Sequence, residues 1–297
     1  MTLETAPRRR SSSKYMLYAV AILLAFVFIF PFLFMISASF KTNDQIFSDL
    51  ESARAFLPVG DLTLDNYAGV ISGSGIGLYM FNSVLITVCT VGLGLIVNSL
   101  AAFSLSRLEW SGKKLVLSLL VILLIIPLEA IAVPMMLFVA QLPGIAFGSD
   151  GFEITGSWLN THHVQIFPFV ANAFSIFLFY QFFQAIPKDF DEAAYVDGAS
   201  PLQVYRHVIL PLSLPVFATV TILQCLAAWN QYLWPVITVP GEQARPLMVG
   251  LGQFFGRTTE WGQVMAYATL ITVPVLIAFI VFQRWFVRSV IGSGVKG

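Results

Sequence analysis

Long stretches without any charged residue are the feature that most constrains this chain. Six such stretches lie between residues 14 and 41, 65 and 107, 114 and 129, 153 and 188, 206 and 242, and 260 and 284. Each contains or begins an apolar run close to the ~20 residues that an α-helix needs to cross a bilayer. The sequence therefore predicts six membrane-spanning helices, at about 15–39, 78–105, 115–139, 165–185, 213–238 and 263–287.

Composition excludes a soluble globular protein. Charged residues make up 11% of the 297 residues and hydrophobic residues 57%, whereas soluble domains carry about 25% charged residues. We expect an all-α integral membrane protein with an N-terminal arm at 1–14, a six-span domain at 15–287 and a C-terminal tail at 288–297. Cys89 and Cys225 each lie within an apolar run, which predicts packing roles and neither a disulfide nor a metal framework.

The distribution of Lys and Arg predicts which side of the membrane each segment faces. Six spans place both termini on one side, and twelve basic residues fall on that side against four on the other. The twelve are Arg8, Arg9, Arg10, Lys14, Arg107, Lys113, Lys114, Lys188, Arg206, Arg284, Arg288 and Lys296; the four are Lys41, Arg54, Arg245 and Arg257. Cytoplasmic segments carry the excess, so both termini are predicted to be cytoplasmic. A secretory signal would also begin with basic residues, but the apolar run at 15–40 is far longer than the ~7–15 residues of a signal core.

One polar segment, at about 187–211, interrupts the apolar chain on the predicted cytoplasmic side. Acidic residues in its first turns suit the positive end of a helix dipole, and Gly198 supplies a left-handed residue that ends this helix. Ser200 and Gln203 have the spacing of a capping box, with a proline at the first position of a second helix. We expect Pro211 to end that second helix.

The first helix of this segment presents small side chains on one face. Its positions i, i+3, i+4 and i+7 are Phe190, Ala193, Ala194 and Asp197, so another surface can approach closely there. These local signals alone fit an ordinary hairpin between two spans equally well. A DNA-reading helix-turn-helix is excluded, because the segment is not basic and lies between apolar spans.

The run Glu192-Ala193-Ala194, with Gly198 four residues later and Ile209-Leu210-Pro211 beyond, resembles the EAA loop of bacterial ABC importer permeases. The resemblance implies a coupling helix that docks in a cleft of a separate ATP-binding subunit. Gly198 would fix the backbone, the two alanines would allow close approach, and Glu192 would make a charged or capping contact. The implied ATPase-coupling residues are Glu192, Ala193, Ala194, Asp197, Gly198 and Ala199.

The end of the fifth predicted span combines aromatic rings with amide groups. The run from Trp229 to Pro235 resembles a segment of sugar-importer permeases, in which an acid commonly stands at the place of Gln231. Rings and amides suit a sugar, and an aromatic belt at the membrane surface uses the same residue types. Both interpretations stay open.

Later segments resemble the maltose-type, or G-type, second permease subunit of carbohydrate importers. They are Arg245-Pro246-Leu247, Trp261-Gly262, Phe282-Gln283-Arg284 and Gly294-Val295-Lys296-Gly297. The resemblance implies uptake of a disaccharide or oligosaccharide such as maltose or trehalose, although glycerol-3-phosphate and polyol importers share this subunit type. It implies a bacterial or archaeal cell membrane. The implied partners are membrane lipid, a second homologous permease, two ATP-binding subunits and an extracytoplasmic sugar-binding protein, with no nucleic acid.

Glu129 is the one acidic residue within the predicted spans. A charge at that depth costs ~2.5 kcal/mol or more, so Glu129 is predicted to face a pathway or partner, or else to be a snorkelling or protonated structural acid. Pro127 and Pro134 flank it and predict a kinked or broken helix. The substrate-pathway candidates are Glu129, Trp229, Asn230, Gln231 and Trp234.

No catalytic, cofactor or metal motif is evident. The pair Gly112-Lys113 lacks the glycine that a phosphate-binding loop places five residues earlier, where Arg107 stands. Adjacent His162 and His163 do not face each other on a helix, and no third ligand is near. A transporter without an ATP site either borrows an ATPase or uses an ion gradient, and a gradient-driven transporter more often shows paired intramembrane ionisable residues. The polar loop favours the borrowed ATPase.

Overall fold

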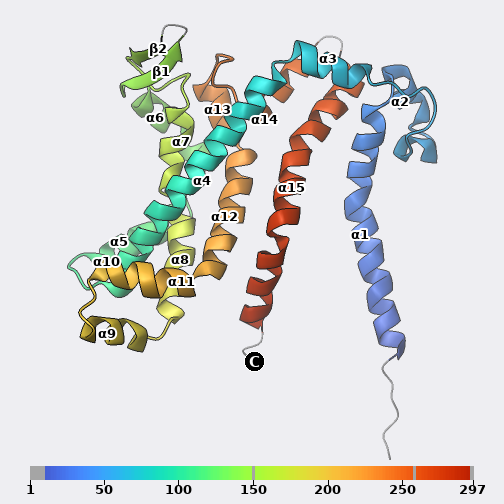
Figure 1. The fold of residues 1–297 in the computed structure, drawn as a ribbon. Coiled ribbons are helices and arrows are strands. Elements are labelled where there is room, and N and C mark those ends of the chain that lie inside the picture. The colour runs from blue at the N-terminus through green and yellow to red at the C-terminus, as the bar shows by residue number, and fades with distance from the viewer. Residues whose placement is uncertain (1–10, 149–150, 257–258, 295–297) are drawn as a thin grey trace, which may run out of the picture. The chain divides into compact units, whose positions relative to one another are not determined.

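The computed structural model describes residues 11–148, 151–256 and 259–294, and helices dominate it (Figure 1). Contacts divide the chain into two units. The N-terminal unit comprises Met1–Ser74 with Gln253–Thr272, and the central unit comprises Gly75–Gly252 with Val273–Gly297. Each unit is described by itself below.

The N-terminal unit begins with a long apolar helix, α1 (Ser11–Ser39), followed by α2 (Asn43–Asp49), η1 (Ala53–Phe56) and α3 (Asp65–Gly73). Most described side chains of α1 are exposed and apolar. The end of α1 is fixed by Lys41, whose buried ammonium group contacts the Asp49 carboxylate at 3.0 Å and donates to the Arg54 carbonyl at 2.6 Å. Burial of both partners makes this ion pair stronger than an exposed one.

The central unit is built around α4 (Ile76–Arg107), which packs mainly against α7 (His163–Val170), α8 (Ala173–Ala185) and α12 (Leu214–Trp229). A Cβ atom at Gly94 would lie 2.8 Å from the Gln224 side chain. Small residues permit such close helix contacts, which dispersion forces stabilise inside a membrane. One hydrophobic core of the central unit contains the buried side chains of Phe179, Phe183 and Ile209.

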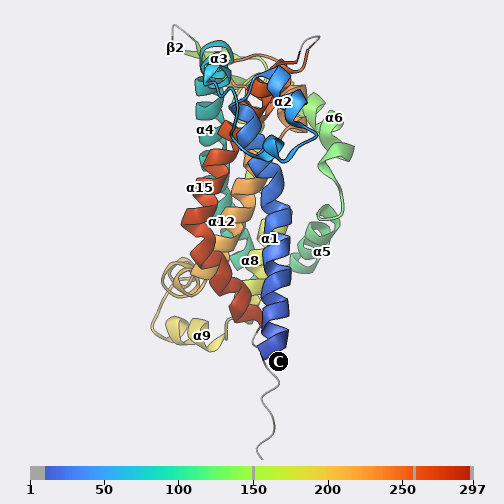
Figure 2. The ribbon, with the colours of Figure 1, turned by 90° about the vertical axis from the view of Figure 1, so that its right-hand side faces the viewer.

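Several helices of the central unit are broken. α5 (Lys113–Leu123) and α6 (Leu128–Val139) meet at 109° (Figure 2). The break lies at Pro127, which confirms the predicted kinked or broken helix, while α6 continues through Pro134. α7 and α8 are separated at 171–172, and α12 is followed after a gap by α13 (Leu233–Thr238). The remaining elements are α9 (Asp189–Val196), α10 (Pro201–Val204), η2 (Tyr205–Ile209), α11 (Leu210–Leu212), α14 (Leu247–Gly250), η3 (Leu251–Phe254) and α15 (Trp261–Gly294).

Helices cover each of the six predicted spans, and one short β-hairpin qualifies the all-α expectation. Among the described residues, three helices suffice by length and composition to cross a membrane, or up to five if each bent pair is one span. The count of six therefore stays a prediction. The segment at 141–163 contains β1 (Gly144–Gly148) paired antiparallel with β2 (Gly151–Thr155). Both strands are short aromatic and β-branched runs that begin at glycine, a pattern typical of hairpins.

Candidate functional site

The polar segment between α8 and α12 folds as an elbow, which we define as residues 187–213. It lies at the opposite end of the central unit from the β-hairpin (Figure 1). Gly198 has a φ of +83°. Its N–H donates to the Tyr195 carbonyl at 3.0 Å, and the Ala199 N–H donates to the Ala194 carbonyl at 2.9 Å. These two bonds form a Schellman motif, so the predicted helix end at Gly198 is confirmed.

The second arm of the elbow runs through α10, η2 and α11. The Ser200 N–H donates to Oε1 of Gln203 at 2.7 Å, which confirms the predicted capping box. The helix ends at Leu212, one residue after Pro211, which agrees with the predicted end within the ordinary uncertainty of a helix boundary. η2 is a π-helical turn, and its wider path relieves the clash between a proline ring and the carbonyl one turn earlier.

A buried ion pair joins the elbow to α4. Nη1 of Arg107, in the last turn of α4, lies 3.1 Å from Oδ2 of Asp191 in α9, and both side chains are buried. Nη2 of Arg107 also donates to the carbonyls of Phe183 and Ile186, at 2.7 and 2.8 Å. Burial raises the pKa of the Asp191 carboxyl group, and the Arg107 guanidinium opposes that rise. One guanidinium thus holds the end of α8 and the start of α9.

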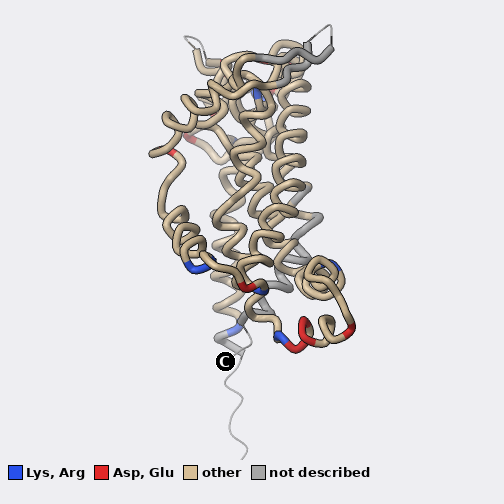
Figure 3. Tube along the Cα trace, turned by 90° about the vertical axis from the view of Figure 1, so that its left-hand side faces the viewer, with Lys and Arg blue, Asp and Glu red and all other residues tan. Residues whose placement is uncertain are grey.

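The structure divides the predicted coupling residues between two surfaces. Ala194 and Ala199 pack against the core of the central unit, whereas Glu192, Ala193, Asp197 and Gly198 are exposed. Charged residues cluster around α9 (Figure 3). Exposed apolar side chains accompany them: Val196 is 87% exposed, and Phe190, Tyr195 and Leu202 are also exposed. Because an apolar cluster beside charged groups is typical of a protein-binding surface, the exposed face of α9 can receive a partner.

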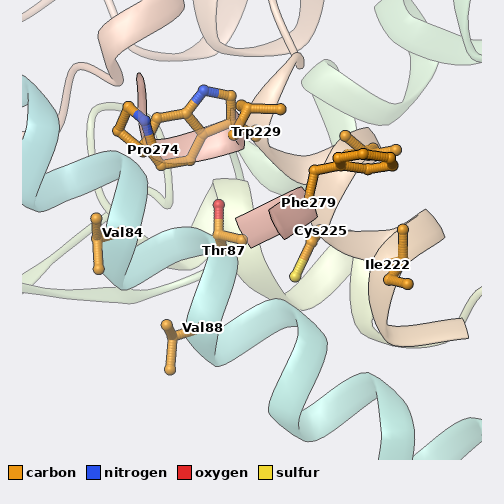
Figure 4. A pocket seen from close by; sticks show the side chains of 10 residues that line it. Val84, Thr87, Val88, Ile222, Cys225, Trp229, Pro274 and Phe279 are labelled. Atoms are coloured by element: carbon orange, nitrogen blue, oxygen red, sulfur yellow. The ribbon is translucent and has the colours of Figure 1, made fainter. Parts of the chain in front are cut away.

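Trp229 lines an apolar cavity of about 180 Å³ between α4, α12 and α15 (Figure 4). Val84, Thr87 and Val88 contribute from α4, Ile222, Cys225 and Trp229 from α12, and Pro274 and Phe279 from α15. The lining is almost entirely carbon, so this cavity lacks the convergent polar groups that a sugar site needs. Trp229 therefore contributes packing surface here.

Gln231 lines a second cavity of about 70 Å³ between α4, α7 and α12, which has more polar groups than the first although most of its surface is apolar, and which we call the polar cavity. The cavity is also bordered by Thr90, Gln165, Phe169, Asn172, Gln224, Ala227 and Ala228. Its side chains combine amides, a hydroxyl group and an aromatic ring, none of them charged. This is the chemistry of a site for neutral hydrogen-bonding groups.

The other pathway candidates do not converge on either cavity. Trp234 is fully buried, and its indole N–H donates to the Val164 carbonyl at 2.7 Å, so it is part of the core. Asn230 is exposed and donates to the Leu226 carbonyl at 2.8 Å. Glu129 is exposed in the first turn of α6, where a carboxylate suits the helix dipole. The histidine pair is likewise structural: the His162 ring contacts Oδ1 of Asn82 at 2.9 Å.

Sequence reasoning missed three residues that the structure makes prominent. Arg107 and Asp191 are 84 positions apart in the sequence, so nothing local indicates that they pair. Gln224 had a usable signal, because it lies inside an apolar run seven residues before Gln231, a spacing that places the two amides on one face of the helix predicted at 213–238. An uncharged polar residue inside a span is itself a pointer to a partner or cavity.

Comparison with known proteins identifies similar chains. A family model described as a binding-protein-dependent transport system inner membrane component matches residues 90–292. A trehalose/maltose transport system permease protein of Thermococcus litoralis is 30% identical, over 98% of this chain and 99% of its own length. A lactose transport system permease protein of Rhizobium radiobacter is 28% identical, over 96% of this chain and 97% of its own length.

One solved structure has a similar fold over nearly the whole chain. It belongs to a bacterial ABC transporter involved in the import of the acidic polysaccharide alginate, and it aligns with a TM-score of 0.76. The alignment covers 95% of this chain and 100% of the other, at 22% identity. The likeness supports a helical membrane fold of this type.

Proposed function

The chain belongs to the family of binding-protein-dependent transport system inner membrane components, and on that premise we propose that it is the permease subunit of an ATP-driven sugar importer. It is a multi-pass membrane protein with helices long and apolar enough to span a bilayer. As a permease subunit, it would form half of the translocation pore, and ATP hydrolysis would take place in separate subunits.

The elbow is the observation that carries this proposal. It combines an exposed face with charged and apolar side chains and a Schellman-capped helix, and it is joined to α4 by the buried Arg107–Asp191 pair. A docking partner that moved α9 would therefore move the ends of α4 and α8 as well. An ATPase bound at this face could convert nucleotide closure into a change of pore access, as rigid-body switching requires.

The remaining partners follow from the family and from exposed surfaces. The name of the family implies an external binding protein that delivers the solute. The apolar side chains of α1, exposed in this chain, would be covered by lipid and by a second, homologous permease. The excess of basic residues supports a cytoplasmic location for both termini and the elbow, where two ATP-binding subunits would dock.

A neutral sugar is the solute that the lining residues favour. The relatives named above transport trehalose, maltose or lactose. In the described part of the chain, no Lys or Arg borders either cavity, whereas a glycerol phosphate would require cationic groups. Maltose and trehalose are therefore the first solutes to test.

Co-purification tests the proposal. We expect the ATPase subunits to copurify with the wild-type permease and to be lost from the Val196→Asp variant, which places a charge on the exposed face of α9. Val59→Asp, at an exposed valine of the N-terminal unit, is the matched control and should retain them. Gradient-driven uptake by the purified chain alone would refute the proposal and identify a secondary transporter.

A further inference from the structure

The helix break between α7 and α8 is satisfied by one buried side chain of α4. Nδ2 of Asn98 donates to the Val170 carbonyl at 3.0 Å, and Oδ1 of Asn98 accepts from the Asn172 N–H at 2.9 Å. Asn172 then caps α8, because its Oδ1 accepts from the Ser175 N–H at 2.9 Å. Broken helices inside membrane proteins are tolerated where the freed backbone groups find partners or line a cavity. Here both conditions hold, since Asn172 also lines the polar cavity.

Two side chains that border that cavity each carry a buried polar atom without a partner within the described part of the chain. They are the hydroxyl oxygen of Thr90 and Oε1 of Gln224, on side chains that are 4% and 7% exposed. Nε2 of Gln224 is engaged, because it donates to the Ser175 hydroxyl at 3.1 Å. Buried polar atoms are nearly always hydrogen-bonded, so an unpaired acceptor and an unpaired hydroxyl on two side chains that border one cavity indicate an additional molecule.

The lining defines the chemistry of that molecule. An amide oxygen requires a hydrogen-bond donor, and the Thr90 hydroxyl can either donate or accept. None of the lining residues is charged, so the ligand is neutral, and Phe169 offers an apolar face beside the polar groups. A hydroxyl group meets these conditions, whether it belongs to water or to a sugar.

The size of the cavity determines how much of each source, water or sugar, can enter it. Its volume is about 70 Å³, against the ~10–15 Å³ that one water needs on this measure. Several water molecules fit at once, whereas only the hydroxyl-bearing edge of a sugar ring would enter. The cavity lies at a discontinuous helix, which is where transporters commonly place their solute sites.

We propose that the polar cavity at the α7–α8 break receives hydroxyl groups of the transported sugar during its passage and displaces water that occupies the cavity between transport cycles. The inference rests on the proposed function and deepens it by placing a solute contact in this subunit. Thr90 and Gln224 are its hydrogen-bonding residues, and Phe169 is the adjoining apolar surface. Asn98 is a positioning residue, because it fixes the break without bordering the cavity.

Thr90→Val gives the cleanest test, because the Thr90 hydroxyl has no protein partner to lose. The complete importer is reconstituted in liposomes with its binding protein, and maltose or trehalose moved per ATP hydrolysed is measured. We expect Thr90→Val to reduce this ratio roughly threefold to tenfold, the range of one hydrogen bond, while the thermal stability of the complex stays at the wild-type value. Thr90→Ser, which keeps the hydroxyl group, should restore transport.

Thr221→Val is the matched control on α12, because its hydroxyl donates to the Phe217 carbonyl at 2.8 Å and it lies outside the cavity. It should transport normally. Hydroxyl-radical labelling of Phe169 distinguishes the sources: we expect labelling by adjacent water at rest and less labelling during turnover with sugar. Unchanged transport by Thr90→Val, or labelling that sugar does not alter, would overturn the proposal and leave a water site only. A wild-type complex that moves neither sugar would instead count against the proposed solute.

Discussion

At the scale of single residues, Gly198 shows how a side chain can be excluded by backbone conformation alone. No atom lies within 4 Å of the position that a Cβ would occupy, yet φ is +83°. A non-glycine residue in this conformation is strained by roughly 1–2 kcal/mol. The requirement for glycine here comes from the Schellman turn, and not from crowding.

Gly198→Ala is therefore expected to weaken the elbow by roughly 1 kcal/mol. The measurement is hydrogen exchange at the Gly198 and Ala199 amides, whose bonds to α9 close the turn. Gly77→Ala serves as the control, because Gly77 lies in α4 with open space around it and no positive φ. Exchange in Gly198→Ala equal to that of the wild type would show that the turn does not depend on this residue.

His162 gives a pH-dependent prediction. Asn82 donates through Nδ2 to the carbonyls of Gln243 and Arg245, so its Oδ1 accepts from the His162 ring. Burial, and secondarily the neighbouring His163, lower the pKa of His162 below its ordinary value of 6.5. Above pH 6.5 the ring is neutral in both the folded and unfolded states. As the pH falls below 6.5, only the unfolded chain takes up the proton readily, so the folded state loses stability.

We expect thermal unfolding of the wild type to occur at a lower temperature at pH 5.5 than at pH 7.5. His162→Gln keeps an N–H donor but cannot titrate, so its unfolding temperature should fall less between pH 7.5 and pH 5.5. In His207→Gln, which changes an exposed histidine of the elbow, the unfolding temperature should fall as much as in the wild type. Equal pH dependence in all three proteins would rule out His162 as the source.

At the scale of elements, the sequence predicts that a span is broken, but it predicts the position of only some of the breaks. Proline indicates the α5–α6 break, because it has no N–H and restricts the preceding residue, and the structure breaks there. The α7–α8 break follows Val170, two residues beyond Pro168, and its freed backbone groups are bound by Asn98, 72 positions before Val170. Pro211 lies one residue before the end of its helix, and the π-helical turn that precedes it accommodates its ring. Local composition cannot reveal such tertiary compensation.

Asn98→Ala is expected to destabilise the protein by about 2 kcal/mol or more, because it leaves the Val170 carbonyl and the Asn172 N–H without their partner. Thermal unfolding in detergent measures the change. Asn230→Ala is the matched control: its exposed amide bonds only within its own helix, so the expected change is small. If the two variants unfolded at the same temperature, another group would have to satisfy the break.

At the scale of the whole molecule, the link between elbow and pore could not be predicted from the sequence. The glycine turn, the capping box and the acidic first turn are local signals, and they are present as predicted. Their attachment to the bundle depends on Arg107, which contacts residues of α9 and the end of α8 that are distant in sequence. A buried guanidinium with three acceptors fixes orientation more firmly than apolar packing alone.

If this ion pair transmits motion, breaking it should uncouple ATP hydrolysis from transport. In the reconstituted importer, we expect Asp191→Asn to reduce sugar moved per ATP by tenfold or more, since loss of one partner from a buried pair costs about 3–5 kcal/mol and each ~1.4 kcal/mol corresponds to a factor of ten. Glu109→Gln, which breaks the exposed pair with Lys113 at 3.5 Å, should have little effect.

A double variant separates mechanical linkage from charge. Arg107→Met with Asp191→Leu replaces the buried pair by apolar side chains that can pack against each other, a change that proteins often tolerate. It should recover stability, because no unpaired charge remains. Recovery of coupling as well would indicate that contact between α4 and α9 suffices, whereas continued uncoupling in a stable complex would assign the transmission to the guanidinium and its hold on the α8 carbonyls. If Asp191→Asn instead moved as much sugar per ATP as the wild type, the ion pair would not be part of the path that transmits motion.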